Sequence, residues 1–505
     1  MNYSNKWLAR FKTKPHGNTG SFSQFLFSNA ENKRYLDMAG AAIIVQFMLF
    51  KLCYPFADYF NDSFTYIDAA EHHHAMSVRP IGYSRFLELI HLITSSDTVV
   101  VFLQYLTMQL GALLLFFTIR YFFPVSKTAG KWLFGILLFN PLILYISNYI
   151  SSDGLFAGLS LIWFAQLIWI INRPRWIQLV PLAGLLFVIF SLRYTAIYLP
   201  AIALVALLLS SRNWLFKLTG IAVTVLPLFM EYQRVKYVTQ KETGTAVFSA
   251  FSGWSAANNA LHMYPYIKVR NEDFSSPECK ALNTVVKQYF DTVPPPELPY
   301  PRVTVKYMWG SIGPLKTYMR AVEKQEKIKN YFDAWHAVAP VFLQYSNQLI
   351  RKHPVAYVRY FMWPNAKEYC LPPLESLLSY NEMRTTVDST AIKWFHYKSE
   401  KVAALNPTIQ ARILSPIPWL FLFVNIALGL LLPLVIIKRK HYALPPGLIR
   451  TLLLVGVFWV TSFCFFVYAA PTLIRYLFFP MIIYSAFLLT IISIMIKNRY
   501  QPSGQ

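Results

Sequence analysis

The sequence predicts an all-α polytopic membrane protein with about ten transmembrane helices. A mainly helical extracytoplasmic domain is predicted between the seventh and eighth of them. Of the 505 residues, 55% are hydrophobic and only 14% are charged, and the mean hydropathy is +0.37. This composition is too apolar for a soluble globular enzyme of this length. One long polar stretch, residues 232–414, separates a first group of apolar segments from a second, shorter group.

Ten segments contain the roughly 20 mostly apolar residues that a spanning helix needs. Residues 36–231 hold seven and are predicted to form a membrane module, and residues 415–496 hold three. A long polar N-terminal stretch does not resemble the short basic region of a signal peptide. Residues 1–35 and 497–505 are therefore predicted to be tails. The ten segments lie near residues 36–57, 98–120, 132–150, 154–171, 176–192, 195–211, 214–231, 415–437, 450–469 and 474–496.

The positions of Lys and Arg predict the orientation, because positively charged short loops stay in the cytoplasm. With the N-terminus inside, the inner segments hold 19 basic residues and the short outer loops hold four. Both tails are therefore predicted to be cytoplasmic, in what we expect to be a bacterial inner membrane. This asymmetry also accounts for much of the net charge of +23, so a nucleic-acid partner is not predicted.

The long polar stretch, residues 232–414, is predicted to be an outer domain with its own core. It carries 23 basic and 14 acidic residues, and prolines at 294–296, 299 and 301 interrupt helix formation. We expect short helices joined by ordered turns. Cys279 and Cys370 both lie on the predicted oxidising side, which leaves a disulfide between them open.

Ionisable residues at the predicted helix ends gather on the outer side. A charge at membrane depth costs roughly 2.5 to 3.5 kcal/mol, so its presence there indicates a functional or structural role. Arg binds phosphate through a planar fork, and a carboxylate accepts a proton or holds a divalent cation. The alternative is that these residues only cap helices and pair with one another. They are Asp58, Asp62 and Asp68 in the first outer loop (residues 58–97), and Asp153, Arg193 and Arg475 at later junctions.

The first outer loop contains three consecutive histidines, at positions 72 to 74, soon after the acidic residues. Imidazole beside carboxylate can bind a transition metal. Consecutive side chains on a helix point in different directions, however, so His72, His73 and His74 cannot all bind one ion from regular structure. The sequence therefore favours headgroup contact or solvation.

Five short motifs carry the outer-face residues. They are Asp62-Ser63 with Tyr66 and Ala70, Arg79-Pro80-Ile81-Gly82-Tyr83, Ser152-Asp153-Gly154-Leu155-Phe156, Leu192-Arg193-Tyr194, and Ile474 to Pro480. In this order the chain resembles the GT-C superfamily of integral-membrane glycosyltransferases, which includes protein O-mannosyltransferases and the lipid A aminoarabinose transferase. Those enzymes move a sugar from a polyprenyl-phosphate carrier to a glycan, lipid or protein acceptor at the outer face.

The resemblance implies roles for individual residues. Asp62 would be the catalytic base or would position the acceptor, and Asp153 would be the second acid. Arg193 and Arg475 would bind the carrier phosphate, with Tyr66 and Arg79 as further substrate contacts. This chain has Asp62-Ser63 where many members have Asp-Glu, and it has Asp153 where many have Glu. Metal dependence varies across the superfamily, so no cofactor is predicted with certainty and a divalent metal is left open.

Trp254, Asn258 and Asn259 combine an aromatic ring with paired amides, which suits contact with an acceptor sugar. Core packing is the alternative for such residues. Two other functions are also left open: a lipid-linked sugar transporter or flippase, and a non-catalytic polysaccharide-assembly membrane protein. The low number of charges midway through the segments argues against a transporter.

Overall fold

The structure is a computed structural model that describes residues 20–293, 304–469 and 471–499. These residues form helices joined by turns, with no β-strand among them, which confirms the predicted all-α class. Parts of the two predicted tails, residues 1–19 and 500–505, lie outside the described residues. So do the prolines at 294–296, 299 and 301.

Among the described residues, eight helices are long and apolar enough to cross a membrane, which supports a membrane protein. Two further predicted segments form shorter apolar helices, so the count of ten spans stays a prediction. These are η1 (Trp176–Gln178) with α10 (Leu179–Leu192), and η2 (Tyr194–Tyr198) with α11 (Leu199–Leu209). The eight are α3 (Ala30–Cys53), α6 (Asp97–Phe122), α7 with α8 (Lys127–Leu138, Pro141–Asn148), α9 (Ser152–Asn172), α12 (Trp214–Thr243), α21 with α22 (Ile409–Leu414, Ile417–Ile437), α23 (Pro446–Ala469) and α24 (Ile474–Arg499).

Polar residues fix the start of several of these helices, because they bond backbone N–H groups that the helix leaves unpaired. The Asn213 side chain accepts from the Phe216 N–H at the start of α12. α12 continues to Thr243, beyond residue 231 where the membrane module was predicted to end. Gly244 follows with a φ of +72°, a left-handed conformation that glycine adopts without steric cost.

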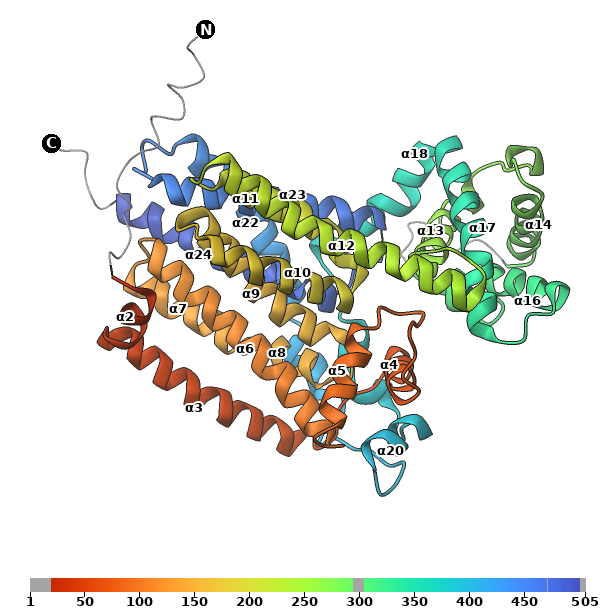
Figure 1. The fold of residues 1–505 in the computed structure, drawn as a ribbon, viewed down its shortest axis with the longest axis horizontal. Helices are drawn as coiled ribbons and strands as arrows, with labels where there is room; N and C mark the ends of the chain where they lie inside the picture. Colours follow the sequence, from red (N-terminus) through yellow and green to blue (C-terminus); the bar gives the residue numbers. More distant parts are fainter. Residues whose placement is uncertain (1–19, 294–303, 470, 500–505) are drawn as a thin grey trace, which may run out of the picture.

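The basic loops gather at one end of the helical bundle. The Ser126 N–H donates to Ser493 Oγ at 2.9 Å, and the Arg450 guanidinium donates to the Leu209 carbonyl at 3.2 Å. Figure 1 shows α2 (Phe22–Phe27) at the same end as the C-terminal part of α24. The segments predicted to be cytoplasmic therefore share one end, while their orientation in a cell stays a prediction.

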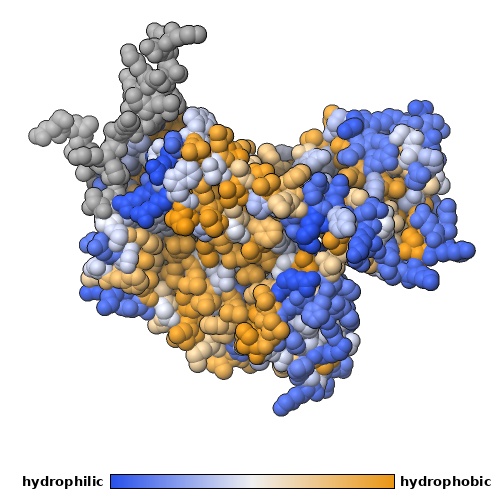
Figure 2. All heavy atoms as spheres, in the orientation of Figure 1, coloured by the Kyte–Doolittle hydropathy of each residue, from blue (hydrophilic) through white to orange (hydrophobic). Residues whose placement is uncertain are grey.

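A second hydrophobic core, built from residues 250–361, lies outside the bundle. Trp254 and Trp335 stack at its centre with ring centroids 3.8 Å apart. Figure 1 shows its helices beside the far end of α12, and Figure 2 shows a largely hydrophilic surface over them, in contrast to the apolar bundle. The helices are α13 (Ala250–Leu261), η3 (Tyr264–Tyr266), η4 (Asn271–Asp273), α14 (Pro277–Thr292), α15 (Lys306–Trp309), α16 (Pro314–Glu326), α17 (Tyr331–Lys352), α18 (Pro354–Tyr357) and the π-helix η5 (Val358–Met362).

Buried side chains between residues 369 and 414 belong to the core of the bundle. The predicted outer domain, residues 232–414, thus contributes to both cores. This segment packs against the first outer loop, which contains α4 (Asn61–Glu71) and α5 (Gly82–His91). Its helices are α19 (Trp363–Cys370), η6 (Glu375–Leu378), η7 (Tyr380–Met383) and α20 (Ser389–Phe395).

All four cysteines are free thiols. Cys279 is buried in the second core, whereas Cys370 ends α19, whose Tyr369 packs in the core of the bundle. The disulfide that the sequence left open is therefore not formed in this structure.

We predict that Gly158→Val destabilises the protein. α6 and α9 pack closely at this point, and a Cβ on Gly158 would lie 2.7 Å from the backbone nitrogen of Met108. Overpacking of this kind costs about 1 to 3 kcal/mol. Thermal unfolding of the detergent-solubilised protein measures it. Gly135→Val in α7, where a Cβ meets nothing within 4 Å, is the control, and equal losses from both would contradict the close contact.

Candidate active site

The candidate site lies at the end of the bundle opposite the basic loops, where α9 begins. Ser151 caps this helix and Asp153 lies in its first turn. A carboxylate is favoured there because a helix N-terminus carries a partial positive charge. Asp153 is only 4% exposed, so its charge needs partners within the protein.

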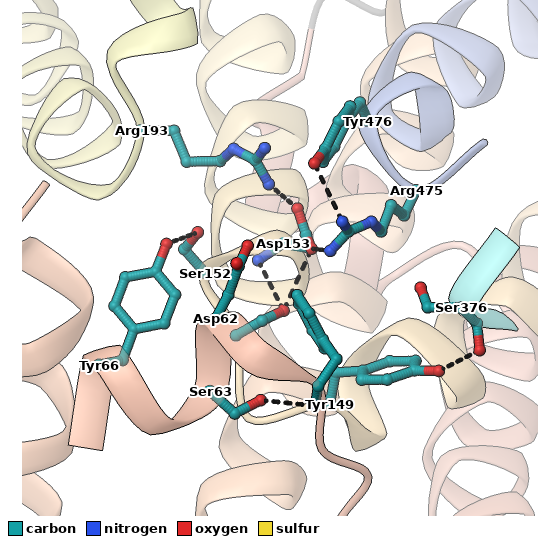
Figure 3. Close-up of polar contacts among 12 residues, drawn as sticks. Asp62, Ser63, Tyr66, Tyr149, Ser152, Asp153, Arg193, Ser376, Arg475 and Tyr476 are labelled. Carbon is teal, nitrogen blue, oxygen red and sulfur yellow. Dashed lines mark hydrogen bonds and ion pairs between the residues drawn. The ribbon is translucent and has the colours of Figure 1, made fainter. Parts of the chain in front are cut away.

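Two arginines from distant parts of the chain supply these partners (Figure 3). Arg193, in extended conformation after α10, forms an ion pair with Asp153 Oδ1. Arg475, at the start of α24, donates its Nη1–H to Asp153 Oδ2 at 3.1 Å. Tyr476 contacts both guanidinium groups: its hydroxyl accepts from Arg475 at 3.0 Å, and its ring centroid lies 4.4 Å from Arg193 Cζ.

Asp62 forms a second ion pair beside the first. It lies in the first turn of α4 and pairs with Arg79 from the loop before α5. One turn along α4, the Tyr66 hydroxyl and Ser152 Oγ are hydrogen-bonded at 3.0 Å, which joins α4 to α9. Burial raises the pKa of Tyr66, while the positive charges of Arg79 and Arg193 oppose that rise. Figure 3 shows Asp62 beside the Asp153 pairs.

These five charged side chains, which we call the Arg–Asp cluster, contain three guanidinium groups and two carboxylates. Each is at most 21% exposed. Glu375 also acts on Arg475, but it is exposed to solvent. The Nε–H of Arg475 is buried and has no hydrogen-bond partner among the described residues. An unused donor on a buried guanidinium group favours an anionic ligand, and phosphate matches the guanidinium fork.

A cleft beside Arg79 separates the cluster from the second core. It is narrow, with a volume of about 20 Å³, and is lined by the loop before α5, the start of η2, α12 and the start of α13. Of the charged residues described above, Arg79 lines the cleft, and Asp62, Asp153 and Arg475 do not. Its apolar walls include Val78, Ile81, Val235, Val238 and Phe248, and its polar groups include Arg79, Arg234 and His336.

Comparisons with protein-family models, with curated proteins and with solved structures found no match. The geometry of the cluster and the resemblance of the motifs are therefore the grounds for a functional proposal.

The cluster itself does not offer a ready metal site. Its two carboxylates already face arginines. Among the residues that the structure describes, the side chains close enough together to hold a metal ion are Asp68, His72 and His74. A divalent metal held by Asp62 and Asp153, which the sequence left open, therefore gains no support from this geometry.

The proposed acceptor residues lie on α13 and are buried. Trp254 Nε1–H donates to the Trp335 carbonyl at 3.0 Å. The amide of Asn258 donates to the Thr304 carbonyl at 3.0 Å, and that of Asn259 donates to the Ala469 carbonyl at 3.1 Å. Since these side chains have partners inside the protein, the structure favours core packing over contact with an acceptor.

Two contacts of the site, Tyr476 and Ser152, lie in the sequence motifs but were given no role from the sequence. A tyrosine follows the arginine in both Arg193-Tyr194 and Arg475-Tyr476, and this repeated pair is the signal that could have indicated an aromatic partner for the guanidinium groups. Ser152 has no comparable signal, because serine next to a helix cap is common.

Asp58 and Asp97 are buried acids that connect the first outer loop to the segment after α19. Asp58 Oδ1 accepts from the backbone N–H of Asn381 at 2.8 Å. Asp97 Oδ2 accepts from the Ala57 N–H at 2.6 Å and from the Tyr397 hydroxyl at 2.8 Å. Burial raises the pKa of Asp58 to about 8, although the bond from Asn381 opposes the rise.

We predict that the wild-type protein loses stability as the pH rises because Asp58 ionises, and that Asp58→Asn abolishes this loss. The folded protein holds a proton on Asp58 up to about pH 8, whereas an unfolded Asp releases it near pH 3.9. Stability due to this group therefore falls as pH rises between these values. Thermal unfolding should show Asp58→Asn close to wild type near pH 4 and increasingly more stable than wild type as the pH rises to about 8.

The exposed residue Asp291, paired with Lys287, provides the control for this measurement. Asp291→Asn should follow the wild-type pH profile. The buried-acid interpretation fails if Asp58→Asn and Asp291→Asn give parallel profiles.

We predict that Asp153→Asn destabilises the protein by about 3 kcal/mol or more, because it leaves two buried guanidinium groups without their carboxylate. Combining it with Arg193→Met should cost less than the sum of the single changes, since one unpaired charge is then removed. Thermal unfolding of the single and double variants measures this coupling. Strict additivity would contradict it.

Proposed function

We propose that this protein is a membrane glycosyltransferase of the GT-C type, which moves a sugar from a polyprenyl-phosphate carrier to an acceptor at the outer face of the membrane. The single observation that carries the proposal is the Arg–Asp cluster, with three guanidinium groups and two carboxylates at one end of an apolar helical bundle. The proposal includes the predicted ten spans, the predicted orientation and a bacterial inner membrane.

The carrier phosphate is assigned to the arginines. Arg475 offers an unused Nε–H, and Arg193 lies on the other side of the same carboxylate. Phosphate at a buried cationic site is stabilised more than in water, because the local dielectric is low. A prenyl tail would extend along the apolar surface of the helices while the headgroup remains at the cluster.

In the proposed reaction, an acceptor hydroxyl attacks the anomeric carbon of the sugar. A bond forms between that carbon and the acceptor oxygen, and the bond from the carbon to the phosphate oxygen breaks. Asp62 accepts the hydroxyl proton, and the leaving polyprenyl phosphate keeps the electron pair, opposite Arg475 and Arg193. Asp153 acts as a positioning residue, because its two oxygens already face those arginines.

The pairing of Asp62 with Arg79 gives the site a way to respond to substrate. In this pair, Asp62 Oδ1 faces the Arg79 guanidinium group. An anionic headgroup that attracts Arg79 would loosen the pair and leave Asp62 available to the acceptor. Arg79 also lies over the Phe251 ring, 5.1 Å from its centroid. The same movement of Arg79 would therefore change its contact with the second core.

We predict that Asp62→Asn and Arg475→Met each reduce sugar transfer at least 100-fold in proteoliposomes, because a base or a phosphate contact contributes roughly that much. The assay supplies radiolabelled polyprenyl-phosphate sugars, tested one by one, and measures both labelled acceptor and released polyprenyl phosphate. Asp291→Asn and Arg320→Met are matched controls, since both residues are exposed and distant in the fold.

The same assay distinguishes the other functions. Movement of the labelled lipid between leaflets without loss of its sugar would indicate a transporter or flippase. Neither transfer nor movement with any carrier would indicate a non-catalytic assembly protein. Full activity of Asp62→Asn would remove this residue from the mechanism.

A further inference from the structure

The end of α4 brings three potential metal ligands together on the surface of the first outer loop. Asp68, His72 and His74 each offer a ligand atom, and these atoms all lie within 4.8 Å of one another. Asp68 Oδ1 lies 3.3 Å from His72 Nδ1, and Asp68 Oδ2 lies 3.9 Å from His74 Nε2. Tetrahedral zinc with bonds of about 2.0 to 2.1 Å separates its ligand atoms by roughly 3.3 Å, so only small side-chain movements are required.

The backbone explains why two of three consecutive histidines converge. α4 ends at Glu71, His72 is its C-cap, and His73 has a φ of +50° in the left-handed region. The His74 N–H then bonds the Ala69 carbonyl at 3.1 Å. This tight turn places the His72 and His74 rings with their centroids 5.6 Å apart. The expectation that the three side chains diverge assumed a continuous helix, which the structure does not have here.

His73 points to a different partner. Its Nδ1 lies 3.4 Å from Glu88 Oε1 on α5, and its side chain is 76% exposed. It is therefore a natural control for its two neighbours. Asp68 and His72 are one helical turn apart, the spacing at which side chains meet on a helix surface. The Nδ1 atom of His72 also lies 3.1 Å from the Asp68 carbonyl oxygen, a hydrogen bond that metal binding at this nitrogen would replace.

We propose that Asp68, His72 and His74 bind a divalent transition-metal ion, with zinc as the best match. Two imidazoles and one carboxylate are a donor set that zinc accepts, whereas magnesium and calcium prefer oxygen ligands alone. The three side chains are about half exposed, so water can complete the coordination. This inference does not depend on the proposed reaction.

The site's place in the loop gives the ion a positioning role. Its Asp68 lies on α4 six residues after Asp62, about 9 Å along the helix. The chain that follows it, residues 75–79 and 81, lines the cleft and includes Arg79, the partner of Asp62. A metal bound at the turn would fix the start of this segment, and with it the position of Arg79.

The test uses the full-length purified protein in detergent, without a polyhistidine tag and stripped of metal by a chelator. Zn²⁺ is titrated against a chromophoric indicator, and Co²⁺ absorption reports the coordination geometry. We expect one ion per chain for the wild type. His72→Ala, His74→Ala and Asp68→Asn should each weaken Zn²⁺ binding at least tenfold, while His73→Ala should leave it unchanged.

A second measurement is limited proteolysis of the loop that follows the site. Zn²⁺ should protect residues 72–79 from cleavage in the wild type and in His73→Ala, but not in His74→Ala. All of these side chains are exposed, and unfolding temperatures without metal check that the variants fold. The proposal is overturned if wild-type binding is absent, if it persists in His72→Ala with His74→Ala combined, or if His73→Ala weakens it equally.

Discussion

The end of the helical bundle opposite the basic loops depends on one buried interaction, the pairing of Asp153 with Arg193 and Arg475. A charge in an apolar bundle is tolerated only when its partners are in place. The two arginines come from the end of α10 and the start of α24, and Arg475 is 322 residues from Asp153 in the chain. These contacts therefore fix how α9, α10 and α24 meet at this end.

Neighbouring polar contacts hold the same arrangement from several directions. The Tyr66 hydroxyl bonds Ser152 beside Asp153, so α4 cannot move without affecting the start of α9. Asp58 and Asp97 form hydrogen bonds that connect the first outer loop to the segment after α19. These links join different parts of the chain, so several independent contacts hold the cluster in place. A preorganised site requires such support.

The electrostatic balance of the cluster and the apolar character of its surroundings favour the same class of ligand. The cluster holds three guanidinium groups, one of which has an unused N–H donor, and the surface of the helical bundle is largely apolar. A lipid with an anionic headgroup satisfies both conditions. The first outer loop then links three features within one short stretch: the Asp62 carboxylate, the proposed metal ligands, and Arg79 at the cleft.

The sequence alone determined the helical membrane class, since apolar segments of spanning length need no tertiary contact to be recognised. It also indicated Asp62, Asp153, Arg193 and Arg475, because charges at helix ends are costly. Tertiary structure decided which charges pair. It also decided that Trp254 is buried against Trp335 and that a left-handed residue at His73 turns His72 and His74 together. These depend on packing between distant segments and on a single backbone angle, which hydrophobic periodicity does not encode.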